Sequence, residues 1–516
     1  MDGGPRQQEV AEQLKREVRE KAQQRREGHT ARISSDHVSS TEPTSDIHHD
    51  RVESFQGGVN CALINKDSRT FGQSDSILLM FYLEHVFPFL FPFYRPSILL
   101  GGKAWILDMM INSPVVRQAT LCQSSYFFSR ARGTANHNVL CETVLGQTRE
   151  AFGVLRRALQ VISGSDITQH LHSAVRIMAS IIQVQRFETA VLSFNFQAHL
   201  NAAVALFKQL LDSPSAIEPG DPCSRFNALV SLLGPPSSIS PVFKVQIPSA
   251  EQAAFRFSSA LLIFDDIIAS TILQEEPQLY EYYTSLLGDI DGSDPPINLE
   301  AAVGCQNWVL LRICEIAALD AWKQRCKRAG NLDVMELVHS AAAIKDSLER
   351  NLTRLETDPI TVPNGGASLL DAFVHVSDQC QQSNTFTSHT TLITHIWAHA
   401  ALLYLFVVVS GWQPASFDVR FHVSRIIDLL SHQISPPALL RTMVWPFCIA
   451  GCLAEPAQEA HLRGMVAALQ PPSVFATVHK ALEIMENVWR NRDAEDTPNR
   501  DFATCFRSQG DLVLLV

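Results

Sequence analysis

Residues 395–414, HIWAHAALLYLFVVVSGWQP, contain an apolar run from Ile396 to Val409 that decides which solvent the chain folds in. As a helix this run would rise ~21 Å, which is shorter than the ~30 Å hydrocarbon core of a bilayer. The run includes His399, and no basic cluster flanks one side of it to set a membrane orientation. We therefore expect a buried core helix and no membrane span.

His395 and His399 lie four residues apart and share one face of that helix, as the ligands of some zinc sites do. Zinc proteases with this spacing place a glutamate directly after the first histidine to act as general base. Ile396 occupies that position here, and a zinc site would also need a third ligand and an open position. We expect the two histidines to line or cap a packed helix without a metal.

The composition bounds the class of protein. The chain has 516 residues, of which 46% are hydrophobic and 18% charged, so it can bury a large core. This length exceeds one ordinary core and predicts two or more packed units or one long helical array. The net charge of −11 gives the body no overall attraction for nucleic acid phosphates.

The cysteines and the N-terminus indicate the compartment. Eleven cysteines are scattered among apolar residues without a CxxC pair, which is typical of reduced core thiols. Cys448 and Cys452 share a helical face but have no neighbouring ligands, so we expect packed thiols. The first residues, MDGGPRQQEVAEQL, contain no apolar segment of a secretory signal. These features predict a soluble, intracellular protein.

Residues Gln7–Glu27 are strongly charged, lack an apolar stripe and carry oppositely charged pairs four apart, which predicts a helix. A solvated helix is the plain interpretation, and a weak nuclear-import or DNA-phosphate contact is the alternative. The basic residues that would make such a contact are Lys15, Arg16, Arg19, Lys21, Arg25 and Arg26. The polar segment Gly28–Gln73 reads as a linker. We expect residues 1–73 to be a charged helix with a flexible linker, and 74–516 to be one helical domain.

Helical periodicity dominates the remaining sequence, and strand signals are sparse. The clearest segments are 113–131, 170–188, 196–211, 253–270, 305–326, 335–352, 419–433 and 475–493. Before them, Ser74 or Asp75 should cap a helix that runs to Glu84. Pro88, Pro92 and Pro96 should then break it, leaving the aromatic residues of 87–94 as a plug in an extended connection. The predicted fold is all-α, a layered multi-helix bundle.

Asp265 and Asp266 are the residues that most suggest catalysis, because an aspartate-rich helix can hold Mg²⁺ against a diphosphate in all-helical terpene cyclases. Ala269 stands where a third carboxylate is usual. A partner motif is half matched by Asn307 and Glu315, with Leu310 in place of the hydroxyl. No GxxxxGK[ST], GxGxxG or GxSxG motif occurs. We predict no enzyme, no catalytic, cofactor or metal site, and keep a cyclase-like enzyme and an interaction scaffold as alternatives.

Several blocks together resemble the regulatory domain of fungal-specific transcription factors, in the branch around the acriflavine sensitivity control protein. They are 304–323, 396–414, 439–455, 470–493 and the ending CFRSQGDLVLLV, and the resemblance spans roughly 74–516. It implies an all-α regulatory domain of a nuclear transcription regulator, with specialised-metabolite or stress-response genes as targets. A small-molecule effector would fit such a domain.

Complete members of that family read DNA through an N-terminal zinc cluster held by six closely spaced cysteines. Here the first cysteine is Cys61 and the second is Cys122, so the cluster is missing and the charged helix resembles the segment that follows it. We therefore expect only weak or indirect DNA contact, and action through a DNA-binding regulator or a homo- or heterodimer partner. The alternative is a shortened gene sequence, with the cluster encoded upstream of Met1.

Overall fold

The structure is a computed structural model in which the chain divides into two compact units, residues 1–66 and 67–516. It describes residues 72–97, 101–133, 153–157, 160, 170–190, 196–212, 221–234, 237–238, 246–288, 294–357, 382–435, 437–492, 500–507 and 512–516. The expected charged helix at 7–27, and the expected linker up to residue 71, lie outside the described residues. All described residues belong to the second unit.

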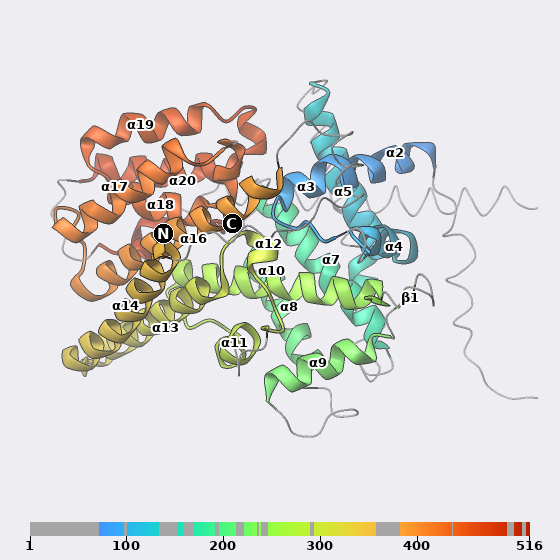
Figure 1. Cartoon of the computed structure of the whole chain (residues 1–516), viewed down its shortest axis with the longest axis horizontal. Coiled ribbons are helices and arrows are strands. Elements are labelled where there is room, and N and C mark those ends of the chain that lie inside the picture. Colours follow the sequence, from blue (N-terminus) through green and yellow to red (C-terminus); the bar gives the residue numbers. More distant parts are fainter. Residues whose placement is uncertain are drawn as a thin grey trace, which may run out of the picture. The chain divides into compact units, whose positions relative to one another are not determined.

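The fold is helical, as the sequence predicted (Figure 1). Its strands, within the described ranges, are one antiparallel pair of two residues each, β1 (Ser237–Ser238) and β2 (Gln246–Ile247). The helices of the first half are α2 (Gln73–Phe81), η2 (Tyr82–Val86), α3 (Phe87–Leu90), α4 (Ala104–Asn112), α5 (Pro114–Ala131), α7 (Leu171–Ala190), α8 (Phe196–Leu211), α9 (Pro222–Leu232), α10 (Ala250–Leu273) and α11 (Tyr280–Leu287).

The second half continues in the same way, with each predicted periodic segment forming a helix. Its elements are α12 (Glu300–Val303), α13 (Asn307–Ala329), α14 (Val334–Thr357), α16 (Gln382–Ser410), α17 (Phe417–His432), η5 (Pro437–Thr442), α18 (Val444–Cys452), α19 (Pro456–Ala467), η6 (Pro472–Val474), α20 (Ala476–Arg490) and α21 (Phe502–Arg507).

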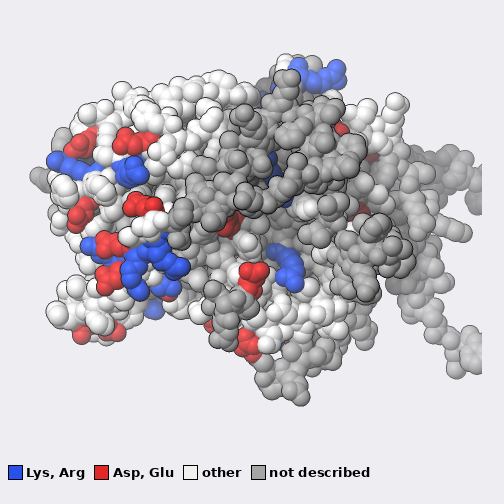
Figure 2. All heavy atoms as spheres, viewed as in Figure 1, with Lys and Arg blue, Asp and Glu red and all other residues white. Residues whose placement is uncertain are grey.

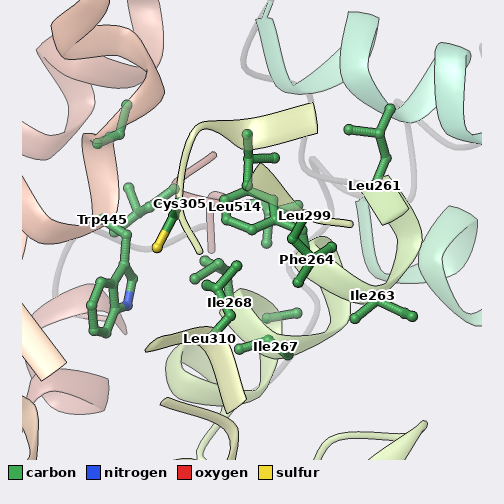
Figure 3. Close-up of a cluster of buried hydrophobic side chains, with 14 of the residues drawn as sticks. Leu261, Ile263, Phe264, Ile267, Ile268, Leu299, Cys305, Leu310, Trp445 and Leu514 are labelled. Atoms are coloured by element: carbon green, nitrogen blue, oxygen red, sulfur yellow. The ribbon is translucent and has the colours of Figure 1, made fainter. Parts of the chain in front are cut away.

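Helix α10 is the central element, and α4, α7, α8 and α13 pack around it. A capping box starts it: the Ser249 hydroxyl accepts the Gln252 N–H at 3.1 Å, and the Gln252 side chain accepts the Ser249 N–H at 2.9 Å. Nearly every residue from Ala254 to Ile272 is buried, because helices cover all sides of α10. Figure 3 shows side chains of α10 in the core, among them Phe264, Ile267 and Ile268, together with Leu299, Leu310 and Leu514 from other elements.

Helix α16 carries the apolar run Ile396–Val409. It begins well before Ile396, so its segment His389–Ser410 reaches 22 residues and is long and apolar enough to cross a bilayer. The length argument based on the run alone was therefore wrong. Burial identifies the helix instead: 78% of its most apolar window lies inside the fold, and Trp397 stacks on Trp445 with ring centroids 5.5 Å apart. It is a core helix, packed against α13, α14, α17 and α18.

The aromatic segment differs from prediction in its backbone. Helix α2 starts at Gln73 with Gly72 at its N-cap, so neither Ser74 nor Asp75 caps it. The chain then stays helical to Leu90, through Pro88, because the π-helix η2 widens the turn just before the proline. The aromatic plug itself is confirmed, since the rings of this segment pack on Phe257 at centroid distances of 4.5–5.7 Å.

Candidate functional site

Asp265 forms a buried ion pair with helix α7 and no metal-type arrangement. Its carboxylate accepts hydrogen bonds from Gln185 Nε2 at 2.9 Å and from the Arg186 guanidinium at 2.5 Å, and the side chain is fully buried. Burial raises the pKa of Asp265 to about 7, and the Arg186 charge opposes that rise. The pair joins α7 to α10 in the middle of the fold.

Asp266 binds the turn that leads into α11. It accepts the backbone N–H groups of Gln278 at 3.2 Å and Leu279 at 2.9 Å, together with the Tyr283 hydroxyl. Burial raises the pKa of Asp266, and these donors oppose the rise. The carboxylate therefore holds the residues just before α11, and Tyr283 within it, against α10.

The other two residues of the cyclase hypothesis also have structural partners. Asn307 Oδ1 accepts the Leu299 N–H at 2.8 Å, and its Nδ2 donates to the carbonyls of Leu287 and Ile297. Glu315 pairs with Arg312 at 2.8 Å near the surface. The described residues contain no group of three or more His, Cys, Asp or Glu that could hold one metal ion. The geometry that a diphosphate-binding cyclase requires is not formed by these four residues.

The histidines of α16 pack against α17. His399 Nδ1 lies 2.9 Å from His422 Nδ1, and both side chains are buried. Burial lowers the pKa of His399 to about 3 and that of His422 to about 4, so both rings are neutral near pH 7. Burial also lowers the pKa of His395. The cysteines that the structure describes are free thiols, and Cys448 and Cys452 are buried in α18, as predicted.

A small interior cavity of about 70 Å³ lies next to the Arg186–Asp265 pair. It is lined by aromatic rings of residues 89–93, by Phe264 of α10, and by polar side chains of three separate elements. Those polar residues are Arg186 and Thr189 of α7, Arg441 and Thr442 of η5, and Thr477 of α20. A cavity of this size admits a few water molecules or a small ligand.

A larger hollow of about 1,020 Å³ lies beside it, between described residues of the 94–108, 247–260 and 294–302 segments. Tyr94, Trp105 and Phe257 form its aromatic wall, and the Trp105 indole donates to the Tyr94 hydroxyl at 2.8 Å. Ala302 lines both hollows. The volume of the larger hollow is in the range of sites for small organic ligands.

Charge on the described surface does not gather into one basic patch on the face shown in Figure 2, where basic and acidic side chains are interspersed. The predicted contact residues Lys15, Arg16, Arg19, Lys21, Arg25 and Arg26 lie outside the described residues. A local basic contact with DNA thus stays a prediction.

The residues that line the cavity were missed in the sequence. Arg186 stands in the mixed segment IIQVQRFETAV, and Arg441 stands in the mostly apolar segment LLRTMVWPF. An arginine inside a mostly apolar run is the signal that could have singled out Arg441, because an isolated buried charge is costly. Nothing in the sequence indicates that the two arginines share one cavity.

Comparison with known proteins supplies the family. The model of the fungal specific transcription factor domain matches residues 77–516. The chain is 36% identical over 448 residues to the transcription factor dibT of Pestalotiopsis microspora, covering 85% of this chain and 70% of that protein. It is 25% identical to the pestheic acid cluster transcriptional regulator 3 of Pestalotiopsis fici, over 82% of this chain and 72% of that protein.

A third relative matches along almost its whole length. The trichothecene biosynthesis transcription regulator TRI10 of Trichoderma arundinaceum is 26% identical over 450 residues, which cover 85% of this chain and 97% of that protein. No solved structure matches. With the family model matching 440 positions from 77 to 516, in a fold of packed helices, this chain belongs to the fungal-specific transcription factor domain family.

Proposed function

We propose that this chain is a nuclear transcription regulator of a specialised-metabolite gene cluster in a filamentous fungus. The observation that carries the proposal is the set of relatives, whose names include regulators of pestheic acid, ustiloxin B and trichothecene production. The packed helical domain, with residues of the cyclase hypothesis committed to structural contacts, supports regulation over catalysis.

We further propose that it acts through a DNA-binding regulator or as a dimer partner. The trichothecene regulators support this mode, because 97% and 94% of their lengths match this chain, so the matched domain is nearly the whole of those proteins.

Deletion of the gene tests the regulatory role. We expect transcripts of a defined, co-regulated gene set to change, and reintroduction of the wild-type chain to restore them. RNA sequencing that shows no difference between deletion and wild-type strains under producing conditions would contradict the proposal.

DNA binding by the purified chain tests the mode of action. We expect weak, sequence-independent binding, with at most six phosphate contacts from Lys15, Arg16, Arg19, Lys21, Arg25 and Arg26. Six contacts correspond to a slope of about −5 in log K against log salt. Replacing all six by alanine should abolish the binding, and the same variant shows whether these residues direct nuclear import. Tight, sequence-selective binding would overturn the indirect mode.

A further inference from the structure

Arg441 is a part-buried guanidinium for which the described residues supply no counter-ion. Within the described ranges it makes no ion pair; it donates a long hydrogen bond to the Leu90 carbonyl at 3.5 Å and lies over the Phe89 ring at 4.4 Å. Burial lowers the pKa of Arg441 to about 9, and the Arg186 charge contributes to this. A buried charge without a partner is unfavourable unless something else neutralises or solvates it.

Among the described residues that line the cavity, the charged side chains and their ion-pair partners leave one positive charge. Arg186 and Arg441 both line it, and the carboxylate paired with Arg186 is Asp265. No aspartate or glutamate stands among the described residues that line the cavity. Val516 lines it too, and among the described residues it forms no ion pair with either arginine. A single bound negative charge would balance the side chains of the centre.

Helix α20 adds a second, independent feature of an anion site. Its N-terminus faces the cavity through Thr477, the second residue of a 15-residue helix whose N-cap, Phe475, makes no side-chain cap. Thr477 is 8% exposed, and among the described residues neither its hydroxyl nor its backbone N–H has a hydrogen-bond acceptor. Uncapped N–H groups and the positive end of the helix dipole favour an anion there.

We propose that this cavity binds the carboxylate of a small organic monoanion, with Arg441 as its charge partner and Thr477 as a further donor. One unbalanced side-chain charge favours a monoanion over phosphate or sulfate. The phenyl rings of residues 89–93 and Phe264 favour an organic ligand over a bare inorganic ion. The planar fork of a guanidinium matches a carboxylate. The role of this ligand as the regulator's effector rests on the proposed function. Its binding to the cavity is independent of that function.

The binding test uses the purified full chain and a matched series of sodium salts at constant ionic strength: acetate, propionate, benzoate, phosphate and chloride. We expect one or more of the carboxylates to raise the melting temperature with a saturable concentration dependence, confirmed by calorimetric titration. Phosphate and chloride should give no saturable shift. Equal effects of all the anions, or no effect of any carboxylate, would overturn the proposal.

Substitutions locate the site. Arg441→Met keeps most of the side-chain volume and removes the charge, so carboxylate affinity should fall about 10- to 100-fold, the range for a charge-assisted hydrogen bond. Arg350→Met is the matched control, because Arg350 is exposed on α14 and bonds its own helix. Thr477→Val keeps the shape and should weaken binding about fivefold or more. Thr477→Val also tests the site if the Arg441→Met variant does not fold. Unchanged affinity in Thr477→Val and Arg441→Met would place the anion elsewhere.

A C-terminal variant separates an added ligand from the chain's own carboxylate. Deleting Val516 together with Leu515 removes the terminal residues nearest the cavity, while Arg441 and Thr477 stay in place. We expect the full chain to bind the added carboxylate before any such deletion. Binding that appears only after the deletion would identify the Val516 carboxylate as the occupant of the cavity, and it would overturn the proposal of a separate ligand.

The effector role has a separate readout. A strain carrying Arg441→Met should show altered target transcripts, whereas one carrying Arg350→Met should match wild type. If the carboxylate binds the purified protein but Arg441→Met leaves target transcripts unchanged, the effector role is wrong and the binding stands. If gene deletion itself changes no transcripts, the proposed function fails while the calorimetric result remains.

Discussion

Asp265 and Asp266 are neighbours in the sequence and are both buried, yet the groups that surround the two carboxylates, here called the Asp265 centre and the Asp266 centre, differ in charge. At Asp266 the carboxylate accepts from two backbone N–H groups and the Tyr283 hydroxyl, all supplied by one short stretch of chain. At Asp265 the carboxylate meets Arg186, and the second guanidinium, Arg441, stands nearby beside a hollow.

This contrast shows how a structural centre can be told from a binding centre. The Asp266 centre is complete: its donors and acceptors satisfy each other within a packed core, so nothing is gained by admitting a ligand. Among the described residues, the Asp265 centre carries one more basic than acidic side chain, and a cavity lies beside it. A small carboxylate bound there would offset the unfavourable free energy of the unpaired positive charge.

Breaking the Arg186–Asp265 pair should cost the most stability. Arg186→Met removes the cation that opposes the rise in the pKa of Asp265, so this buried carboxyl group must take up a proton or stay unpaired; removal of one partner of a buried pair costs about 3–5 kcal/mol. Arg441→Met should instead change the free energy of unfolding by about 1 kcal/mol or less, or raise it, because it removes an unpaired charge. Urea denaturation measures both.

These two arginine variants form a matched pair at one cavity. Should Arg441→Met destabilise the protein as much as Arg186→Met, then Arg441 has a structural counter-charge and the contrast between the two centres fails.

A second loss of stability is expected at the complete centre. Asp266→Ala would leave the Leu279 N–H and the Tyr283 hydroxyl without an acceptor in the core, at a cost of about 3 kcal/mol. Asp266→Asn keeps one acceptor oxygen and should cost less. Thermal unfolding compares the stability of the two variants. Equal stability of Asp266→Ala and wild type would show that the hydrogen bonds of Asp266 contribute little.

The sequence predicted the helices better than the polar centres. Apolar residues at helical spacing predicted α5, α7, α8, α10, α13, α14, α17 and α20, because burial of one face repeats locally along the chain. The prediction at Pro88 was wrong, since the π-helix that accommodates the proline has no sequence marker. Asp265 and Asp266 resembled half of a metal motif, because their partners, Arg186 and Leu279, are set by tertiary packing. The cavity could not be predicted at all, since its polar side chains come from three distant segments.

A third buried polar centre, formed by His399 and His422, should make the stability of the fold depend on pH. Both folded-state pKa values lie well below the ordinary value near 6.5, so the unfolded chain binds protons first as the pH falls. Stability contributed by the neutral rings is present above pH 6.5 and is lost below it, by about 2 kcal/mol per histidine between pH 6.5 and 5. His422→Gln should therefore reduce the loss of stability between pH 7 and pH 5 by about this amount. Denaturation curves at the two pH values measure it; the same pH slope in both proteins would mean that His422 is not held neutral.

Glu315 should contribute least to stability, and it sets the baseline for the buried centres. Its pair with Arg312 links two residues of the same helix, three apart, with roughly a third of each side chain open to solvent. Water screens such a pair, so Glu315→Gln should change the free energy of unfolding by no more than about 0.5 kcal/mol. The cyclase hypothesis predicts instead that Glu315→Gln abolishes activity, because a carboxylate that bound Mg²⁺ would be required for catalysis. Denaturation of Glu315→Gln, together with target transcript levels in a strain that carries it, measures both. A near-wild-type result would show that the cost of altering a charge in this fold depends on burial and partners, whereas a large loss would place Glu315 in a site that the packing of α13 does not reveal.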